Sequence, residues 1–409
     1  MGWRDFVYRP RSIYQANAFL VSMQFLTACN GFWYHRGRYV VNRWTILYTI
    51  AFPNVIFIAL LLGLYQLFND PIQRERIEAM DQLKLTIYAL EVLMTPLNHV
   101  LVMYLMLRKV RGHIALYDRL DALDQQLIRE FGVNLNYHKL LRKNLIKVAI
   151  LPMVHYSAVT WTIIHEVPDR VPQACFFIFL YLLSTSGPNH TCYLHAGFAQ
   201  ILSVRFRLLQ KLLNADFLLT NFPEVRICEV RLQCLVGMVR SFHEIIDDIN
   251  DVYRAALVAV LLHDFTLVTN ILYMLFGHSI GKGDDGIFFA YGAMWLIVPL
   301  HKFISTPNYC SMAVEEGKRC LHLVEQIDIW FPNFKSAKRM VDATMHWRLE
   351  NKIQFTCGFN MIFNRTIIAT ITAVVFNYLL ILIQFRMTQL MGQQIEEQKN
   401  ALHDWVGDL

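Results

Sequence analysis

The chain has 409 residues, of which 55% are hydrophobic and only 17% are charged, and its mean hydropathy is +0.33. A water-exposed surface does not tolerate this much apolar area, so the composition excludes an ordinary soluble protein and predicts an integral membrane protein. The net charge of +6 comes from Lys and Arg residues in a few linkers between apolar segments, which favours contact with membrane lipid over contact with nucleic acid.

Seven apolar segments are long enough to cross a membrane, whose hydrocarbon core needs about 20 helical residues. They are residues 45–68, 83–107, 145–165, 171–202, 255–280, 286–306 and 360–387. Most of them contain a proline, which membrane helices accept as a kink when neighbouring helices satisfy the freed carbonyl groups. The sequence therefore predicts an all-α membrane protein with seven transmembrane helices.

The cationic residues alternate between the linkers that join these segments. The amino-terminal arm, the linker after the second segment and the long linkers after the fourth and sixth segments are rich in Lys and Arg. The other linkers carry only Arg74 and Arg76, then Arg170, then Lys282. Because short loops rich in Lys and Arg stay in the cytoplasm, we expect a cytoplasmic amino terminus and an extracellular carboxyl terminus.

The cytoplasmic linkers carry apolar residues at helical spacing, for example Leu232, Leu235, Val239, Phe242 and Ile246. We expect the last four spans to continue as helices into the cytoplasm and to pack together there. The predicted regions are a cytoplasmic arm with an interfacial helix (1–44), the first six spans with long helical linkers (45–306), cytoplasmic anchor helices (307–359), and the seventh helix with a short extracellular tail (360–409).

The sequence shows no pattern typical of a metal or cofactor site. None of the eight cysteines has the spacing of metal ligands. His243, Glu244 and Asp247 nearly form the HExxH helix of zinc proteases, but an aspartate stands where the second histidine is needed. We interpret these residues as the solvated face of the helix that enters the fifth span, and we expect no metal and no cofactor.

Ionisable side chains inside the predicted spans are a stronger signal, because a charge in lipid costs several kcal/mol unless it faces a partner or water. These side chains are Glu91, His155, His190, His195, His263 and Asp264. They are expected to line a ligand cavity or an ion path, or to be neutral, hydrogen-bonded groups that fix the packing of helices.

The predicted orientation places a mixture of aromatic and polar side chains in the outer halves of spans two to six. Such a mixture is typical of a small-molecule pocket, although Tyr and Trp also form belts at membrane interfaces. The candidate ligand-binding residues are Glu91, Thr95, Tyr156, Trp161, His165, Phe177, Tyr181, Asn270, Tyr273, Phe289 and Trp295.

The last span carries a motif. Tyr378 is followed by five hydrophobic residues (379–383), Gln384 and Phe385. This segment resembles the signature of insect gustatory receptors, which is Thr-Tyr, five hydrophobic residues, then Gln-Phe in the seventh helix. Asn377 replaces the usual Thr. The chain length, the seven spans and the inverted topology agree with that family across the chain.

The resemblance implies a ligand-gated, non-selective channel for monovalent and divalent cations in the plasma membrane of chemosensory neurons. Four subunits, identical or related, would each give the last helix to a central pore. Ile381 and Gln384 would form the gate, with Asn377, Leu380 and Phe385 beside them. On a helix Ile381, Gln384 and Asn377 share a face, and an apolar ring can close a pore by dewetting it.

The resemblance also places the ligand, a small-molecule tastant, in the outer half of the helix bundle. Leu379 stands where related sugar receptors have Glu, which favours a deterrent or another small organic ligand. An odorant receptor of the same superfamily would share the fold and the pore. A G-protein-coupled receptor would need the opposite orientation and motifs that this sequence lacks. A membrane enzyme or transporter would need an acid–base cluster or inverted repeats, which the sequence does not show.

Overall fold

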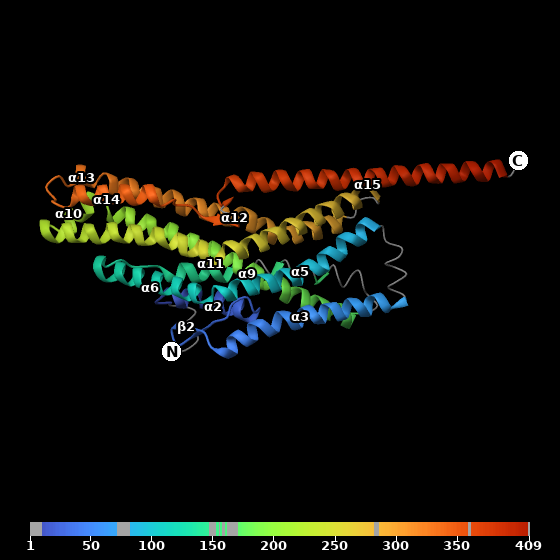
Figure 1. Cartoon of the computed structure of the whole chain (residues 1–409), viewed down its shortest axis with the longest axis horizontal. Helices are drawn as coiled ribbons and strands as arrows, with labels where there is room; N and C mark the ends of the chain where they lie inside the picture. Colours follow the sequence, from blue (N-terminus) through green and yellow to red (C-terminus); the bar gives the residue numbers. More distant parts are fainter. Residues whose placement is uncertain are drawn as a thin grey trace.

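The computed structural model describes residues 10–71, 82–146, 153–154, 156–157, 160–161, 171–281, 286–358 and 361–407. Long helices dominate this part of the chain and run roughly along one axis (Figure 1). Two short antiparallel hairpins join helices, β1 with β2 and β3 with β4. The predicted all-α class is therefore confirmed at the level of a mostly helical protein.

The helices follow one another in chain order with few strands between them. Their bounds are α2 (Ile13–Leu26), α3 (Arg43–Asn69), α5 (Gln82–Arg108), α6 (Val110–Phe131), α7 (Tyr137–Leu145), α9 (Val171–Leu212), α10 (Ala215–Asn221), α11 (Val225–Gly281), α12 (Gly286–Glu325), α13 (Ile327–Trp330), α14 (Ala337–Glu350) and α15 (Thr366–Gly407). The strands are β1 (Trp33–His35), β2 (Arg38–Val40), β3 (Thr356–Cys357) and β4 (Met361–Ile362).

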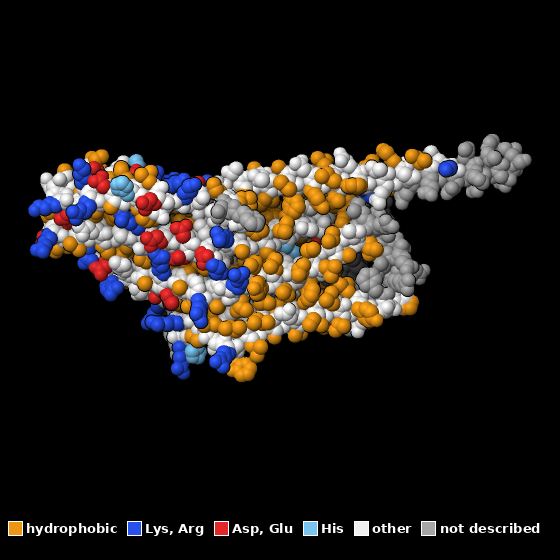
Figure 2. Space-filling model, in the orientation of Figure 1, with side chains coloured by type: hydrophobic (Ala, Val, Ile, Leu, Met, Phe, Trp, Pro, Cys, Tyr) orange, Lys and Arg blue, Asp and Glu red, His pale blue; other side chains and the backbone are white. Residues whose placement is uncertain are grey.

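The molecule has two halves that differ in surface chemistry. Figure 2 shows Lys, Arg, Asp and Glu gathered at the end that contains α6, α10, α13 and α14, and hydrophobic side chains over the part that contains α3, α5 and α15. We call these parts the charged half and the apolar half; α9, α11 and α12 run through both. A surface this apolar needs lipid around it.

Four helices in the described residues are long and apolar enough to span a membrane, and they lie within α3, α5, α11 and α15. They coincide with the first, second, fifth and seventh predicted segments. The fourth and sixth segments lie in α9 and α12, which have 42 and 40 residues. Most of the third segment (145–165) lies outside the described residues.

The charged half has its own core. The amphipathic helix α6 buries Leu116, Tyr117, Leu120 and Leu127 against α2, α9 and α11. α2 packs against α6, α7 and α9 and buries most of its residues. In the centre of this core, a hydrogen bond of 2.6 Å joins His113 Nε2 and the Tyr253 hydroxyl.

The expectation that the last four spans continue as helices is right for α9, α11 and α12 but wrong for α15. α14 ends at Asn351, where the backbone becomes extended, and the β3–β4 hairpin separates it from α15. Gly358 has a φ of 58°, a left-handed conformation that glycine adopts without strain. The hairpin therefore makes α15 a separate rod.

The interpretation of the His243 region as a solvated face is also wrong for His243 itself. Its side chain is 2% exposed and packs between the rings of Phe206 and Trp347, with centroids 4.6 and 5.7 Å away. Glu244 does reach the surface of α11, where it pairs with Arg119. The apolar stripe of this helix is therefore wide enough to include the histidine.

Candidate functional site

Three helices meet at a buried ion pair in the middle of the apolar half. Lys302 of α12 is 1% exposed, and its Nζ lies 2.6 and 2.7 Å from the two carboxylate oxygens of Asp264 on α11. The same ammonium donates to the side-chain carbonyl of Asn189 on α9. An unpaired charge at this depth would cost several kcal/mol, and the ion pair between Lys302 and Asp264 offsets that cost for both residues.

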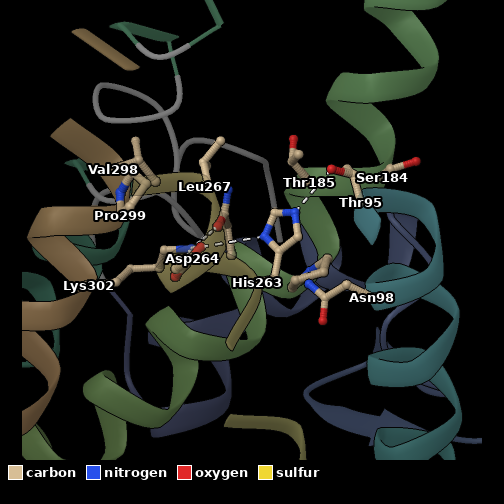
Figure 3. Close-up of a pocket in the computed structure, with 12 residues that line it drawn as sticks. Thr95, Asn98, Ser184, Thr185, His263, Asp264, Leu267, Val298, Pro299 and Lys302 are labelled. Carbon is tan, nitrogen blue, oxygen red and sulfur yellow. Dashed lines mark hydrogen bonds and ion pairs between the residues drawn. The ribbon is translucent and has the colours of Figure 1, made fainter. Parts of the chain in front are cut away.

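His263 connects this pair to α5. Figure 3 shows its ring between Asp264 and Thr95. Its Nδ1 lies 3.8 Å from an Asp264 oxygen, and its Nε2 lies 3.0 Å from the Thr95 hydroxyl. The Thr95 hydroxyl donates to the backbone carbonyl of Glu91 at 2.9 Å, so Nε2 is the donor toward Thr95. A continuous polar chain thus crosses the bundle from α12 to α5.

A small cavity opens beside this chain. Its walls include Thr95 and Asn98 of α5, Ser184 and Asn189 of α9, and Lys302. Ser184 is fully buried, and its hydroxyl has no hydrogen-bond partner among the described residues. The cavity has room for about one water molecule, and a polar cavity of this size is a water site.

A second polar group lies one helical turn from Thr95, toward the start of α5. The Glu91 carboxylate accepts hydrogen bonds from the Tyr181 hydroxyl at 3.5 Å and from the Asn270 amide at 3.3 Å. The Tyr181 ring packs against the Trp295 ring with centroids 5.9 Å apart. The structure therefore brings four of the predicted ligand residues together from α5, α9, α11 and α12. We call Glu91, Tyr181, Asn270 and Trp295 the Glu91 cluster.

The last helix contacts the bundle close to this cluster. Leu382 of α15 is buried with Tyr273 of α11 and Ile87 of α5, and Leu379 packs against them. Ile87 lies one turn from Glu91, and Tyr273 lies one turn from Asn270. Two of the four helices that carry the Glu91 cluster, α5 and α11, therefore also hold α15.

The residues expected at the gate lie on other faces of α15. Ile381, Leu380 and Phe385 are 46, 55 and 62% exposed, and Asn377 and Gln384 are also exposed. Asn377 and Gln384 lie about opposite Leu382 around the helix. This face of α15 is turned away from the rest of the described chain.

The remaining predicted ligand residues are dispersed. The Tyr156 hydroxyl hydrogen-bonds Ser186 on α9, which places it near the bundle interior. Trp161 and Phe289 are 55 and 39% exposed. His165 and the side chain of Phe177 lie outside the described part of the chain.

Sequence reasoning missed Lys302. It is a cation inside the apolar segment 286–306, so the rule that selected Glu91 and Asp264 would also have found it. Among the predicted histidines, His190 lies 3.5 Å from the Thr27 hydroxyl, and His195 packs on Tyr253 and Phe355. These two histidines fit the packing interpretation.

These features define the class of protein: a multi-pass, helical membrane protein with polar clusters inside its apolar half. The chain belongs to the 7tm Chemosensory receptor family, whose model matches residues 19–389. The family is a receptor family and not an enzyme family. Together with the two relatives described next, this match confirms the resemblance to insect gustatory receptors.

Two curated relatives come from Drosophila melanogaster. Putative gustatory receptor 57a is 38% identical over 410 residues, covering 98% of this chain and 99% of that protein. Putative gustatory receptor 47b is 23% identical and covers 91% of each. These matches make the protein a chemoreceptor of the insect receptor superfamily.

The fold also matches solved structures. The insect olfactory receptor OR5 from Machilis hrabei aligns with a TM-score of 0.58, and its complex with eugenol aligns with a TM-score of 0.57. Both alignments cover 93% of this chain and 100% of the other, at 11% identity. The similarity establishes a shared fold.

Proposed function

We propose that the protein is a gustatory receptor that acts as a ligand-gated, non-selective cation channel. A small-molecule tastant binds in the outer half of the bundle formed by spans two to six. Four subunits, identical or related, surround a pore lined by α15, in the plasma membrane of a chemosensory neuron. The amino terminus is cytoplasmic and the carboxyl terminus is extracellular.

The observation that carries this proposal is the contact between α15 and the helices of the Glu91 cluster. Leu382 faces Tyr273 and Ile87, while Ile381, the next residue back, is exposed on another side of the same helix. A ligand that moves α5 or α11 therefore moves the helix that carries the gate. Such a ligand opens the channel if it binds the open arrangement more tightly than the closed one.

The exposed face of α15 supports the pore. Asn377, Ile381 and Gln384 form a stripe that the subunit itself leaves uncovered. Around a central axis, four copies of this stripe place a ring of Ile side chains next to a ring of amides. The apolar ring prevents ion flow by dewetting until the helices separate.

The test is whole-cell recording from cells that express the full chain. Ile381→Ala is expected to raise the ligand-free current, because smaller side chains leave a wider ring, which dewets less readily. Gln384→Glu is expected to favour divalent over monovalent cations. The matched control is Ile383→Ala, since residue 383 is half-buried and about 200° from Ile381 around the helix. Normal currents and selectivity in both gate variants, at normal surface expression, would remove α15 from the pore.

A further inference from the structure

Glu91 is a carboxylate with loosely bound neutral partners. Its two hydrogen bonds, at 3.5 and 3.3 Å, lie beyond the usual range of 2.7–3.2 Å. No Lys or Arg pairs with Glu91 anywhere in the described ranges. A carboxylate can accept about four hydrogen bonds, so Glu91 keeps acceptor capacity for another donor.

Asp264, another acid inside the apolar half, is in the opposite situation. Asp264 is neutralised by Lys302, which lies within 2.7 Å of both of its oxygens. His263 acts electrostatically on Glu91, but its Nδ1 faces Asp264 and its Nε2 is held by Thr95. Of these two acids, Glu91 is therefore the one without a cation of its own in the described part of the chain.

Aromatic rings complete the environment of Glu91. Tyr181 donates to the carboxylate through its hydroxyl and presents its ring to Trp295, at an angle of 56° between the rings. The face of an aromatic ring attracts a cation, and Trp does so most strongly. A carboxylate beside tilted Tyr and Trp rings is an arrangement suited to an organic cation.

We propose that the receptor's ligand carries a protonated or quaternary amine, which binds between the Glu91 carboxylate and the rings of Tyr181 and Trp295. This inference rests on the proposed function only in placing the ligand in the outer half of the bundle. The cation supplies the charge that the chain does not provide at Glu91. A neutral ligand such as a sugar would leave that carboxylate without a counter-charge in apolar surroundings.

The test is equilibrium binding to the purified full-length receptor in lipid nanodiscs, followed by tryptophan fluorescence and by the thermal melting midpoint. The probes are tetramethylammonium, benzyltrimethylammonium and protonated quinine. Neopentylbenzene, the uncharged carbon isostere of benzyltrimethylammonium, reports on shape alone. The variant is Glu91→Gln, which keeps the size and the hydrogen-bonding oxygen but removes the charge. Glu224→Gln, an exposed position before α11, is the matched control.

At least one cation is expected to bind the wild type and the Glu224→Gln control equally. Its dissociation constant should rise by about tenfold or more in Glu91→Gln, the usual effect of removing one partner of a buried charge pair. Binding of neopentylbenzene should be the same in all three proteins. Without ligand, Glu91→Gln should melt no lower than the wild type, because it removes a charge that has no counter-charge. Trp295→Leu should weaken the binding of the cation more than the binding of its neutral isostere, because it removes the aromatic face.

Two results would overturn the inference: no cation of the series binds the wild type, or the cations bind Glu91→Gln as tightly as the wild type. Recording separates this inference from the channel proposal. Charge-dependent binding without any current would preserve the amine site and reject the channel. Currents evoked by neutral compounds and unaffected by Glu91→Gln would preserve the channel and reject the amine site.

Discussion

The two halves of the molecule each contain a buried ion pair, and the two pairs are built differently. In the charged half, Arg205 of α9 binds both oxygens of Asp124 on α6, at 2.7 and 2.8 Å. Tyr137 donates to the same carboxylate at 2.8 Å. In the apolar half, Lys302 binds Asp264 as a single ammonium beside a small cavity.

This difference separates a fixed region from an adaptable one. The planar Arg205 fork, two parallel hydrogen bonds and a third donor define one geometry for α6, α7 and α9. An ammonium on a flexible stem can follow its carboxylate when helices shift, and the water site beside it leaves space. The charged half is thus suited to hold the molecule together, and the apolar half to change shape around the ligand that we propose.

The largest expected effect is at Lys302 and Asp264. Asp264→Leu leaves an unpaired ammonium in the lipid-embedded bundle and is expected to destabilise the receptor by about 3–5 kcal/mol. The double variant Asp264→Leu with Lys302→Met should recover most of that loss, because no charge remains buried. Melting midpoints in detergent and surface expression measure both. A double variant as unstable as the single one would show that the pair itself, and not the isolated charge, decides stability.

In the same experiment, a double variant of the Arg205–Asp124 pair should recover less of the lost stability. Asp124→Leu is expected to cost about 3 kcal/mol, since it leaves Arg205 without its bidentate partner. The double variant with Arg205→Met should recover less than in the apolar half, because the Tyr137 hydroxyl then has no acceptor. Equal recovery in the two halves would remove the distinction between a fixed and an adaptable region.

Acid should weaken the charged half through His113. Complete burial lowers the pKa of His113 to about 3, against 6.5 for an exposed histidine. Between pH 6.5 and 3 the unfolded chain therefore binds a proton that the folded one excludes, so stability falls as the pH falls through this window. The loss is about 2 kcal/mol at pH 5. His113→Gln should flatten the dependence of the melting midpoint on pH, whereas the exposed His322→Gln should not.

The smallest expected effect is at the surface of the charged half. Lys109 and Asp251 form an exposed ion pair at 2.6 Å, and Lys109→Ala should cost at most about 1 kcal/mol. The loss should disappear in high salt, which screens exposed charges. A salt-independent loss would mean that Lys109 contributes through its packing between α5 and α6.

The sequence predicted the broad organisation because membrane physics acts on local patterns. Span length and helical stripes are properties of neighbouring residues, and they located α3, α5, α9, α11, α12 and α15. The break before α15 was missed because the stripe in α14 has the same period as the helix that follows; Gly358 was the available signal.

For the polar clusters, the sequence predicted single residues but not which residues contact one another. Acids inside apolar segments are unusual enough to identify Glu91 and Asp264. Their partners, however, come from α9, α11 and α12, and those of Glu91 lie 90 and 179 positions away in the sequence. Such pairings depend on tertiary packing, which a single sequence does not encode locally. The roles of Ile381, Gln384 and the ligand residues stay predictions.

The β3–β4 hairpin gives the last helix a pivot. Two hydrogen bonds tie the hairpin to α11: the Gly358 N–H donates to the Arg254 carbonyl at 3.2 Å, and the Thr356 N–H donates to the Asn250 side chain at 2.9 Å. Arg365 ties the start of α15 to Asn308 at 2.8 Å. Ile381 lies about 22 Å up the helix from Thr366, so a tilt of about 5° displaces it by roughly 2 Å. A stiff rod hinged at its base works as a lever arm. In the proposed channel, a small displacement at Leu382 would therefore widen the ring of Ile381 side chains without unfolding any helix.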